Sequence, residues 1–479
     1  MYSSFCRWGG LLVLLSQVSV VFAADSYAIV VSQSTHQDPR WQAVTQTLQE
    51  KHPAAKLVVW KEKVDEALEE LKVQHPRYTC FVATPQEAGR QFVADVHQLT
   101  RRFDADPYTD TLWGVLTGFD AENANLIAKR SDPLIIEKVA GGTEVAWKMC
   151  MEADLYDELV PQKHVVRRPG TPAEQRQGPQ DTTRALAETL TSYHADLFVT
   201  SGHATERNWQ IGFAYRNGYF RSQDGQMFGQ TTTGERFEID SKNPKVLLPI
   251  GNCLMGHIDG KDAMALAWMN SVGVHQMIGY TVTTWYGYGG WGVLDYFVEQ
   301  PGRYTLAEAF HANHHALIHR LETGFSNLHQ VEGRPGVQLR KPIQTTPRGK
   351  SLGLTQHDAT GLMWDRDVVA FYGDPAWEAR MHAMPKAYEQ NLTIENGVYT
   401  FTIDPQAGED SFKPINENGS QRGWRPIVMW LPNRIKTATV TAGQDLNPVI
   451  TDDFILVPNP RSCDTDREYK VVFTAEEAE

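Results

Sequence analysis

The feature that most constrains the fold is an alternation of short β-branched runs with longer amphipathic stretches. Such alternation predicts a mostly parallel sheet flanked by helices, because parallel strands need crossover connections that are usually helical. The predicted strands of the first half span residues 27–31, 56–60, 78–83 and 113–117, and the predicted helices span residues 41–50, 63–73, 85–99 and 121–140. The chain is therefore expected to be an α/β protein.

The alternation stops and then resumes along the chain. Residues 164–183 carry Pro-Gly and Gly-Pro pairs, the dibasic pair Arg167-Arg168 and no hydrophobic period, so they are expected to form a linker or a processing loop. After them the pattern continues, with helices predicted at 184–193, 262–270 and 305–321 and strands at 196–200, 246–250, 277–281 and 368–372. From about residue 388 only short strands separated by turn signals remain, which favours a β-sandwich. The expected units are an N-terminal α/β subdomain (24–163), a second α/β subdomain (184–387) and a β-sandwich module (388–479).

The first 23 residues have a mixed, basic start, an apolar run and small residues before Ala24, which predicts a cleaved signal peptide and a secreted or periplasmic protein. No later segment is apolar enough to span a membrane. The chain of 479 residues has a net charge of −13 at pH 7, so general nucleic-acid binding is disfavoured. Besides Cys6 in the leader, four cysteines remain whose pairing the sequence leaves open: Cys80, Cys150, Cys253 and Cys463.

Two loops that follow predicted strands carry reactive side chains. The strand at 196–200 is followed by Ser201-Gly202-His203-Ala204, and the strand at 246–250 by Gly251-Asn252-Cys253-Leu254. Sites in open α/β sheets form beyond the carboxyl ends of strands. If these two strands are neighbours, the imidazole and the thiol share one edge of the sheet, and a Cys-His nucleophilic pair results.

The residue types suit nucleophilic catalysis. A free thiol is mostly protonated at neutral pH, and a nearby imidazole can accept its proton. Backbone N–H groups beside Cys253 and His203 would hold the developing oxyanion. The alternative is that Cys253 is a buried small hydrophobic residue and His203 a hydrogen-bonded loop residue, which is the fate of most such residues.

These motifs carry a resemblance to a known family. Ser201-Gly202-His203-Ala204 with Trp209, Cys253-Leu254-Met255-Gly256, Gly279-Tyr280 and Gly373-Asp374-Pro375, together with the stretch from Asp106 to Ala124, are similar in order and spacing to the gingipain family of cysteine peptidases in the caspase-like clan. The resemblance covers roughly residues 106 to 385. It implies a caspase-like fold followed by a small immunoglobulin-like module, and a protein or peptide substrate.

Carried over by resemblance, Cys253 would be the nucleophile that forms a thioester acyl-enzyme, His203 its base, and the backbone amides of Cys253, Gly202 and Ala204 the oxyanion site. Trp285 is expected to line the substrate pocket, and Asp110 or Asp120 to orient the histidine. The sequence departs from the family pattern at Ala204, Asn252 and Phe119, where glycine, alanine and arginine are usual. The rival hypothesis is therefore a non-catalytic surface or binding module with the same fold.

A zinc hydrolase is a second alternative. His311, His315 and His319 recur every four residues on one predicted helix, a spacing that places them on one face. No His-Glu-x-x-His motif accompanies them. No cofactor is indicated, and a calcium requirement is left open. The aromatic and glycine-rich run 284–292 is expected to be a flexible loop over the substrate.

Overall fold

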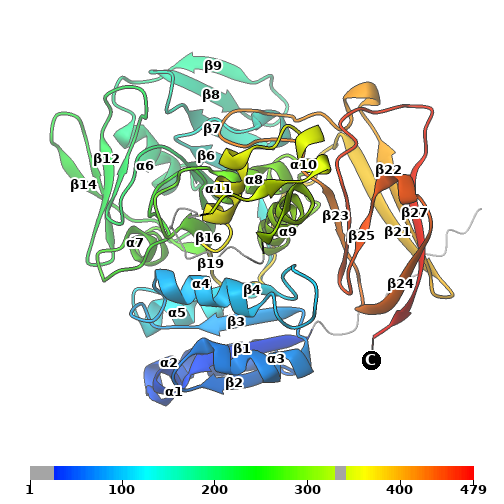
Figure 1. Cartoon of the computed structure of the whole chain (residues 1–479). Helices are drawn as coiled ribbons and strands as arrows, with labels where there is room; N and C mark the ends of the chain where they lie inside the picture. The colour runs from blue at the N-terminus through cyan, green and yellow to red at the C-terminus, as the bar shows by residue number, and fades with distance from the viewer. Residues whose placement is uncertain (1–25, 329–340, 479) are drawn as a thin grey trace, which may run out of the picture.

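A twelve-stranded, mostly parallel sheet runs through the α/β part of the chain (Figure 1). The computed structural model describes residues 26–328 and 341–478, so the predicted signal peptide lies outside the described residues. In spatial order the strands are β2 (Lys56–Trp60), β1 (Tyr27–Ser32), β3 (Tyr78–Val82), β4 (Leu112–Leu116), β19 (Val369–Tyr372), β16 (Val274–Tyr280), β15 (Lys245–Pro249), β10 (Leu197–Thr200), β6 (Lys138–Gly141), β7 (Glu152–Tyr156), β8 (Lys163–Arg167) and β9 (Glu174–Gln177). Only the β16–β19, β7–β8 and β8–β9 pairs are antiparallel. The expected α/β class is confirmed.

Helices flank this sheet, and the central strands are buried on both faces, as in sheets covered by crossover helices. The helices are α1 (Gln33–Gln37), α2 (Pro39–Lys51), α3 (Leu68–Gln74), α4 (Arg90–Leu99), α5 (Ala121–Ala128), α6 (Thr183–Thr191), α7 (Met264–Asn270), α8 (Tyr288–Phe297), α9 (Leu306–Gly324), α10 (Pro347–Ser351) and α11 (Gln356–Asp365). Across the described ranges, no helix has both the length and the apolar character that a membrane crossing requires.

The long helix predicted at 121–140 is wrong in its second half. Helix α5 ends at Ala128, and the chain then forms β5 (Leu134–Ile136) and the interior strand β6. Pro133 blocks continuation of the helix, and the β-branched residues after it suit a strand. β5 pairs with β20 (Ala379–Met381), a contact between segments that are distant in sequence.

The segment 164–183, expected to be an irregular loop, contains strands β8 and β9 at the edge of the sheet. Its polar composition suits this position, because all four residues of β9 are exposed. The guanidinium of Arg168 lies 2.8 Å from Asp154 and over the ring of Tyr193, and Arg167 donates to the Lys148 carbonyl. Cleavage at this dibasic pair stays a prediction.

A small antiparallel sheet is inserted between β10 and β15. It consists of β11 (Asn208–Gln210), β12 (Tyr219–Gln223), β13 (Gln226–Gln230) and β14 (Arg236–Ile239). Its buried Trp209 and Phe220 pack edge-to-face, and Trp209 also contacts Phe198 of β10. The Trp209 indole N–H donates to the Ser201 carbonyl at 2.8 Å, which fixes the start of the His203 loop.

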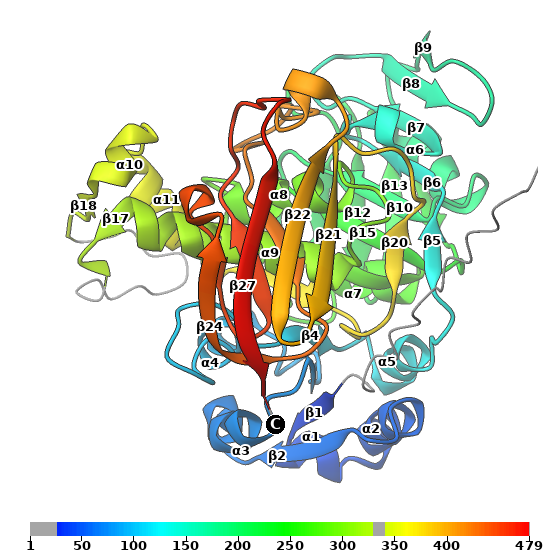
Figure 2. The ribbon, with the colours of Figure 1, turned by 90° about the vertical axis from the view of Figure 1, so that its right-hand side faces the viewer.

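The C-terminal part forms two antiparallel sheets around a second hydrophobic core (Figure 2). One sheet has the order β21 (Tyr388–Glu395), β22 (Val398–Pro405), β27 (Tyr469–Glu477), β24 (Ile435–Ala442), and the other β23 (Ile427–Trp430), β26 (Phe454–Val457), β25 (Val449–Ile450). We call this part the C-terminal unit. Buried ion pairs join it to α8: Asp295 contacts Arg422 at 2.7 Å and Arg425 at 3.0 Å. Breaking one partner of such a pair leaves an uncompensated buried charge.

The run 284–292 is only partly a loop. From Tyr288 onward it forms the buried helix α8, so the prediction of a flexible covering loop is wrong for that half. Its glycines allow close packing: a Cβ on Gly290 would meet the Ile250 carbonyl oxygen and would lie 2.6 Å from the Tyr280 ring. The Gly290 N–H also donates to the Tyr280 hydroxyl at 2.9 Å.

Gly290→Ala is therefore expected to lower the free energy of unfolding by about 1–3 kcal/mol or more. The melting temperature should fall with it. The direction of the change tests the packing argument, because replacing glycine with alanine at an unobstructed helix position stabilises the helix by about 1 kcal/mol. Differential scanning calorimetry measures the shift. Gly260→Ala, where an added Cβ meets no atom within 4 Å, is the control. An unchanged melting temperature for Gly290→Ala would contradict the packing argument.

Candidate active site

The strands that lead to His203 and Cys253 are neighbours. β10 and β15 pair in parallel, with Thr200 opposite Pro249, and both loops leave at the carboxyl end of their strand. The expected adjacency of these two strands is confirmed. Both side chains are accessible, because His203 is exposed and Cys253 is half-buried.

Asn252 joins the two loops. Its side chain is fully buried, accepts a 2.6 Å hydrogen bond from the Thr200 hydroxyl and donates to the Gly202 carbonyl at 3.0 Å. The residue before the thiol is thereby tied to the residue before the imidazole. A buried, fully hydrogen-bonded amide of this kind restricts the relative position of the two loops. Alanine, the usual residue of the resembled family here, could not make this connection.

The Cys253 sulfur lies against the chain that follows β16. The Thr284 backbone N–H donates to the sulfur at 3.2 Å, and the Thr284 hydroxyl donates to the Asn252 carbonyl at 3.0 Å. A backbone N–H directed at sulfur stabilises negative charge there. Leu254, directly after the cysteine, has a positive φ of 59°, an uncommon conformation for a leucine that gives the loop a sharp turn at the thiol.

The His203 loop is shaped by Gly202. Gly202 has φ of +90°, a conformation that glycine adopts without strain. Ala204 has no positive φ, so the alanine that replaces the usual glycine there carries no backbone strain of this type. The His203 ring packs against Phe213 with ring centroids 4.6 Å apart.

The backbone amides expected to form an oxyanion site are available. For Gly202, Ala204 and Cys253, the described part of the chain contains no recorded acceptor for the backbone N–H. The bridge between Ala204 and Trp209 uses the neighbouring Thr205 and Gln210 amides instead. These three donors therefore remain free to bind a developing oxyanion.

Glu158 is a carboxylate near this site that sequence reasoning missed. It follows β7, and its Oε1 accepts a 2.8 Å hydrogen bond from Ser201 of the His203 loop. Its carbonyl accepts from the N–H of Phe213, the residue that packs on His203. Burial raises the pKa of Glu158, and its Oε2 has no recorded hydrogen-bond partner. No local sequence signal marks this residue, because its place depends on β7 lying two strands from β10.

The two aspartates predicted to orient His203 lie elsewhere. The Asp110 carboxylate accepts from the Phe103 N–H at 2.8 Å, and β19, β16 and β15 separate β4 from β10. Asp120 caps helix α5 by accepting from the Asn123 N–H. The structure therefore does not bring either carboxylate to the histidine. Trp285, by contrast, directly follows Thr284 and is 47% exposed, so its expected role in substrate binding stays a prediction.

The helix-face histidines of α9 do not converge on one point. His311 accepts from the Trp113 N–H at 2.9 Å, His315 stacks on Phe454 at 4.2 Å, and His319 lies 3.3 Å from the Tyr108 hydroxyl. Each has a different partner because α9 is packed between the sheet and the C-terminal unit. Within the described ranges these three imidazoles form no metal-binding group, so this face gives the zinc-hydrolase alternative no support.

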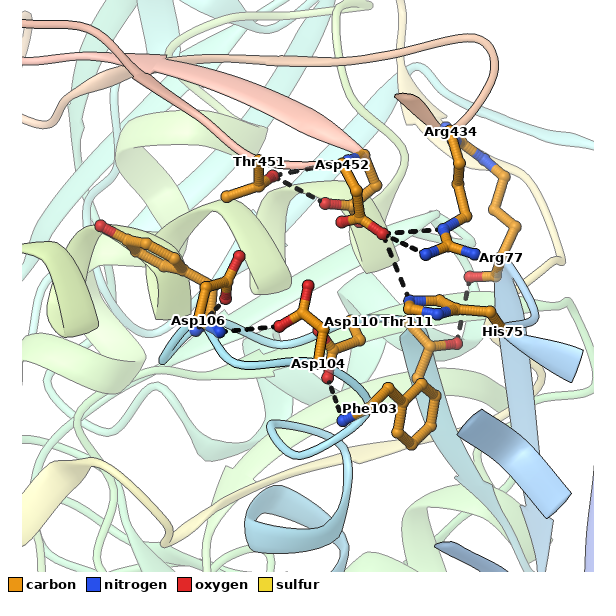
Figure 3. Close-up of polar contacts among 12 residues, drawn as sticks. His75, Arg77, Phe103, Asp104, Asp106, Asp110, Thr111, Arg434, Thr451 and Asp452 are labelled. Carbon is orange, nitrogen blue, oxygen red and sulfur yellow. Dashed lines mark hydrogen bonds and ion pairs between the residues drawn. The ribbon is translucent and has the colours of Figure 1, made fainter. Parts of the chain in front are cut away.

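In the part of the chain that the structure describes, two other groups of potential metal ligands have ligand atoms within 4.8 Å of one another. One is the buried set His97, His314 and Asp367, but Arg101 lies 2.8 Å from Asp367 and already balances its charge. The other is Asp104, Asp106 and Asp110, where the C-terminal unit meets the loop before β4 (Figure 3). Oxygen ligands of this type suit a hard cation such as Ca²⁺.

Near these three aspartates, Asp452 of the C-terminal unit is already paired. Its carboxylate lies 2.8 Å from Arg434 Nε and 3.4 Å from His75 Nε2 (Figure 3). Burial raises the pKa of Asp106 to about 6 and that of Asp110 to about 9, which disfavours their charged forms. The acidic group is thus separate from the thiol and imidazole and lies where the C-terminal unit meets the loop before β4.

Comparison of the chain with family models, with curated proteins and with solved structures finds no match.

Proposed function

We propose that this protein is an exported cysteine endopeptidase of the caspase-like type, with Cys253 as nucleophile and His203 as its base. The thiolate attacks the carbonyl carbon of the peptide bond, the amine leaves with a proton from the imidazole, and water then hydrolyses the thioester. As part of the same proposal, the C-terminal unit is an immunoglobulin-like module. Support comes from the order and spacing of the motifs and from the arrangement of the two loops.

The observation that carries the proposal is the Asn252 side chain, which ties the thiol loop to the imidazole loop at neighbouring strand ends. Free N–H groups at Gly202, Ala204 and Cys253 add donors for the oxyanion. Exposed aromatic side chains flank the pair: Phe213 beside His203 is 48% exposed, and Trp285 is 47% exposed. They offer apolar surface to an extended polypeptide substrate.

Native-state alkylation tests the proposal. Iodoacetamide is expected to modify Cys253 while sparing Cys80 and Cys150, which are fully buried. Burial raises the pKa of Cys150 to about 12, so its thiol stays protonated and unreactive. Mass spectrometry locates the modified thiol, and a diverse peptide library measures cleavage of the same samples. The fraction of peptidase activity lost should equal the fraction of Cys253 modified.

If the unmodified protein cleaves no member of the library, the rival hypothesis of a binding module without catalysis is favoured. Activity that survives complete modification of Cys253 would assign the nucleophile elsewhere. An activity that a chelator removes and zinc restores would instead support the hydrolase alternative.

A further inference from the structure

We infer that a cavity of about 510 Å³ between α9, α10 and the C-terminal unit binds a small molecule carrying a phosphate or sulfate group. The cavity is separate from the Cys253 loop and does not depend on the proposed peptidase activity. Its volume lies within the range of small-molecule sites. α9 and the C-terminal unit face each other across this part of the molecule (Figure 1).

The lining of the cavity concentrates positive charge. Arg320, Arg348, Arg461 and Arg467 line it, together with His319, and among the described lining residues Asp445 alone is acidic. Asp445 is already paired with Arg467. The chain as a whole has a net charge of −13, whereas this cavity places four guanidinium groups around one carboxylate and is locally positive.

Two of these guanidinium groups lack a counter-charge. In the described residues no carboxylate pairs with Arg348 or Arg461, and Arg320 approaches Asp358 only to 4.0 Å. The Nε of Arg320 is buried and has no hydrogen-bond acceptor among residues 26–328 and 341–478. Although Arg461 is exposed, partial desolvation and the nearby charges of Arg320 and Arg348 lower the pKa of its guanidinium, as expected for like charges held close together. A multiply charged anion removes that repulsion.

The backbone holds the cavity wall in an uncommon conformation. Trp424 and Arg461 have φ of 56° and 66°, and the Arg461 guanidinium lies over the Trp424 ring, 5.6 Å from its centroid. Bulky residues rarely adopt positive φ, and such strain gathers at ligand clamps. The Trp424 indole holds the Arg461 guanidinium in place. The planar fork of N–H donors on the guanidinium matches the oxygens of a tetrahedral oxyanion.

Isothermal titration calorimetry of the full chain with inorganic pyrophosphate and with sulfate, at constant ionic strength, tests the inference. Saturable binding is expected, and Arg348→Gln and Arg461→Gln should each weaken it about tenfold or more. Arg176→Gln, an equal charge change on exposed β9, should leave it unchanged. Tighter binding of pyrophosphate assigns the site to phosphorylated molecules, and tighter binding of sulfate to sulfated ones.

A second measurement needs no variant. Phenylglyoxal modifies accessible arginines, and the bound anion should protect Arg348 and Arg461 but not Arg176, as read by peptide mass spectrometry. Absence of saturable binding for both anions, or equal affinity in the Arg348→Gln/Arg461→Gln double variant, would overturn the inference. Protection that extends equally to Arg176 would do the same, because it would indicate general ionic screening.

Discussion

Replacing Cys253 with alanine is expected to abolish peptide hydrolysis, with kcat/KM lower by about 10⁴-fold or more, because no other group can form the acyl-enzyme. His203→Ala should lower kcat by a similar order, since the thiol then loses its base. The melting temperature should change little in either case, because His203 is exposed and Cys253 is half-buried. Progress curves with the best substrate of the peptide library measure the loss.

The matched control is Cys463→Ala, which removes a cysteine from the core of the C-terminal unit. This variant should retain its peptidase activity.

A double variant tests whether the two site residues act as one unit. The kcat/KM of Cys253→Ala/His203→Ala should be no lower than that of Cys253→Ala alone, because the effects of residues that act as one unit are not additive. Turnover by Cys253→Ala at the wild-type rate would refute the proposed mechanism.

Acidification below about pH 4 is expected to unfold the protein cooperatively, because α9 and α4 bury histidines that must stay neutral. Burial lowers the pKa of His97 to about 4 and of His311 to about 3, and it holds the pKa values of His314 and His315 well below the ordinary value. An unfolded histidine titrates near 6.5, so below that pH the unfolded chain binds protons that the folded chain cannot. The contribution of the histidines to stability is therefore full above pH 6.5 and is lost as the pH falls towards their folded values.

Each of these four histidines contributes a slope of up to about 1.4 kcal/mol per pH unit, against a typical total stability of 5–15 kcal/mol. Carboxyl groups whose pKa is raised by burial act in the opposite direction above about pH 4: Asp106 at about 6, Asp365 at about 7, Asp110 at about 9, and also Glu299 and Asp453. The net loss of stability therefore falls below about pH 4, where these carboxyls are protonated in both states and the most strongly shifted histidines still favour the unfolded chain. Circular dichroism against pH, in urea to bring the transition into range, measures the midpoint and the slope.

His315 gives the sharpest variant for this test. It is fully buried, neither ring nitrogen has a hydrogen-bond partner, and the ring stacks on Phe454. His315→Leu should lower the midpoint pH and reduce the slope by about one histidine's share, about 1.4 kcal/mol per pH unit. His194→Asn, on an exposed turn with positive φ that asparagine tolerates, is the control. An unchanged acid transition in His315→Leu would contradict the buried-histidine explanation.

The strands of the large sheet could be predicted because their signal is local. The runs that form β1, β2, β3, β10 and β15 are apolar and β-branched over their own length, so no distant contact is needed to recognise them. The predictions failed where a distant partner decides the structure. β6 is inserted beside β10, and β8 and β9 extend the edge of the same sheet.

The candidate site divides in the same way. Its reactive residues were recognisable because each directly follows a predicted strand, and the order of strands in a parallel sheet brought those two strand ends together. The roles of Asn252 and Glu158 required the fold, since each acts through a contact more than 40 residues away in sequence. Asp110 and Asp120 lie in the stretch that resembles the family, but a position along the chain does not fix a distance across a sheet.

Residue types and their local periodicity thus determined that this chain builds an α/β sheet with a thiol and an imidazole after two of its strands. Only the tertiary structure decided which polar groups are buried. The spacing of the α9 histidines suggested a metal-binding face, yet His311 and His315 are buried, the first against Trp113 of the sheet and the second against Phe454 of the C-terminal unit. Burial depends on what packs against a helix from elsewhere in the chain, and a local pattern does not contain that information.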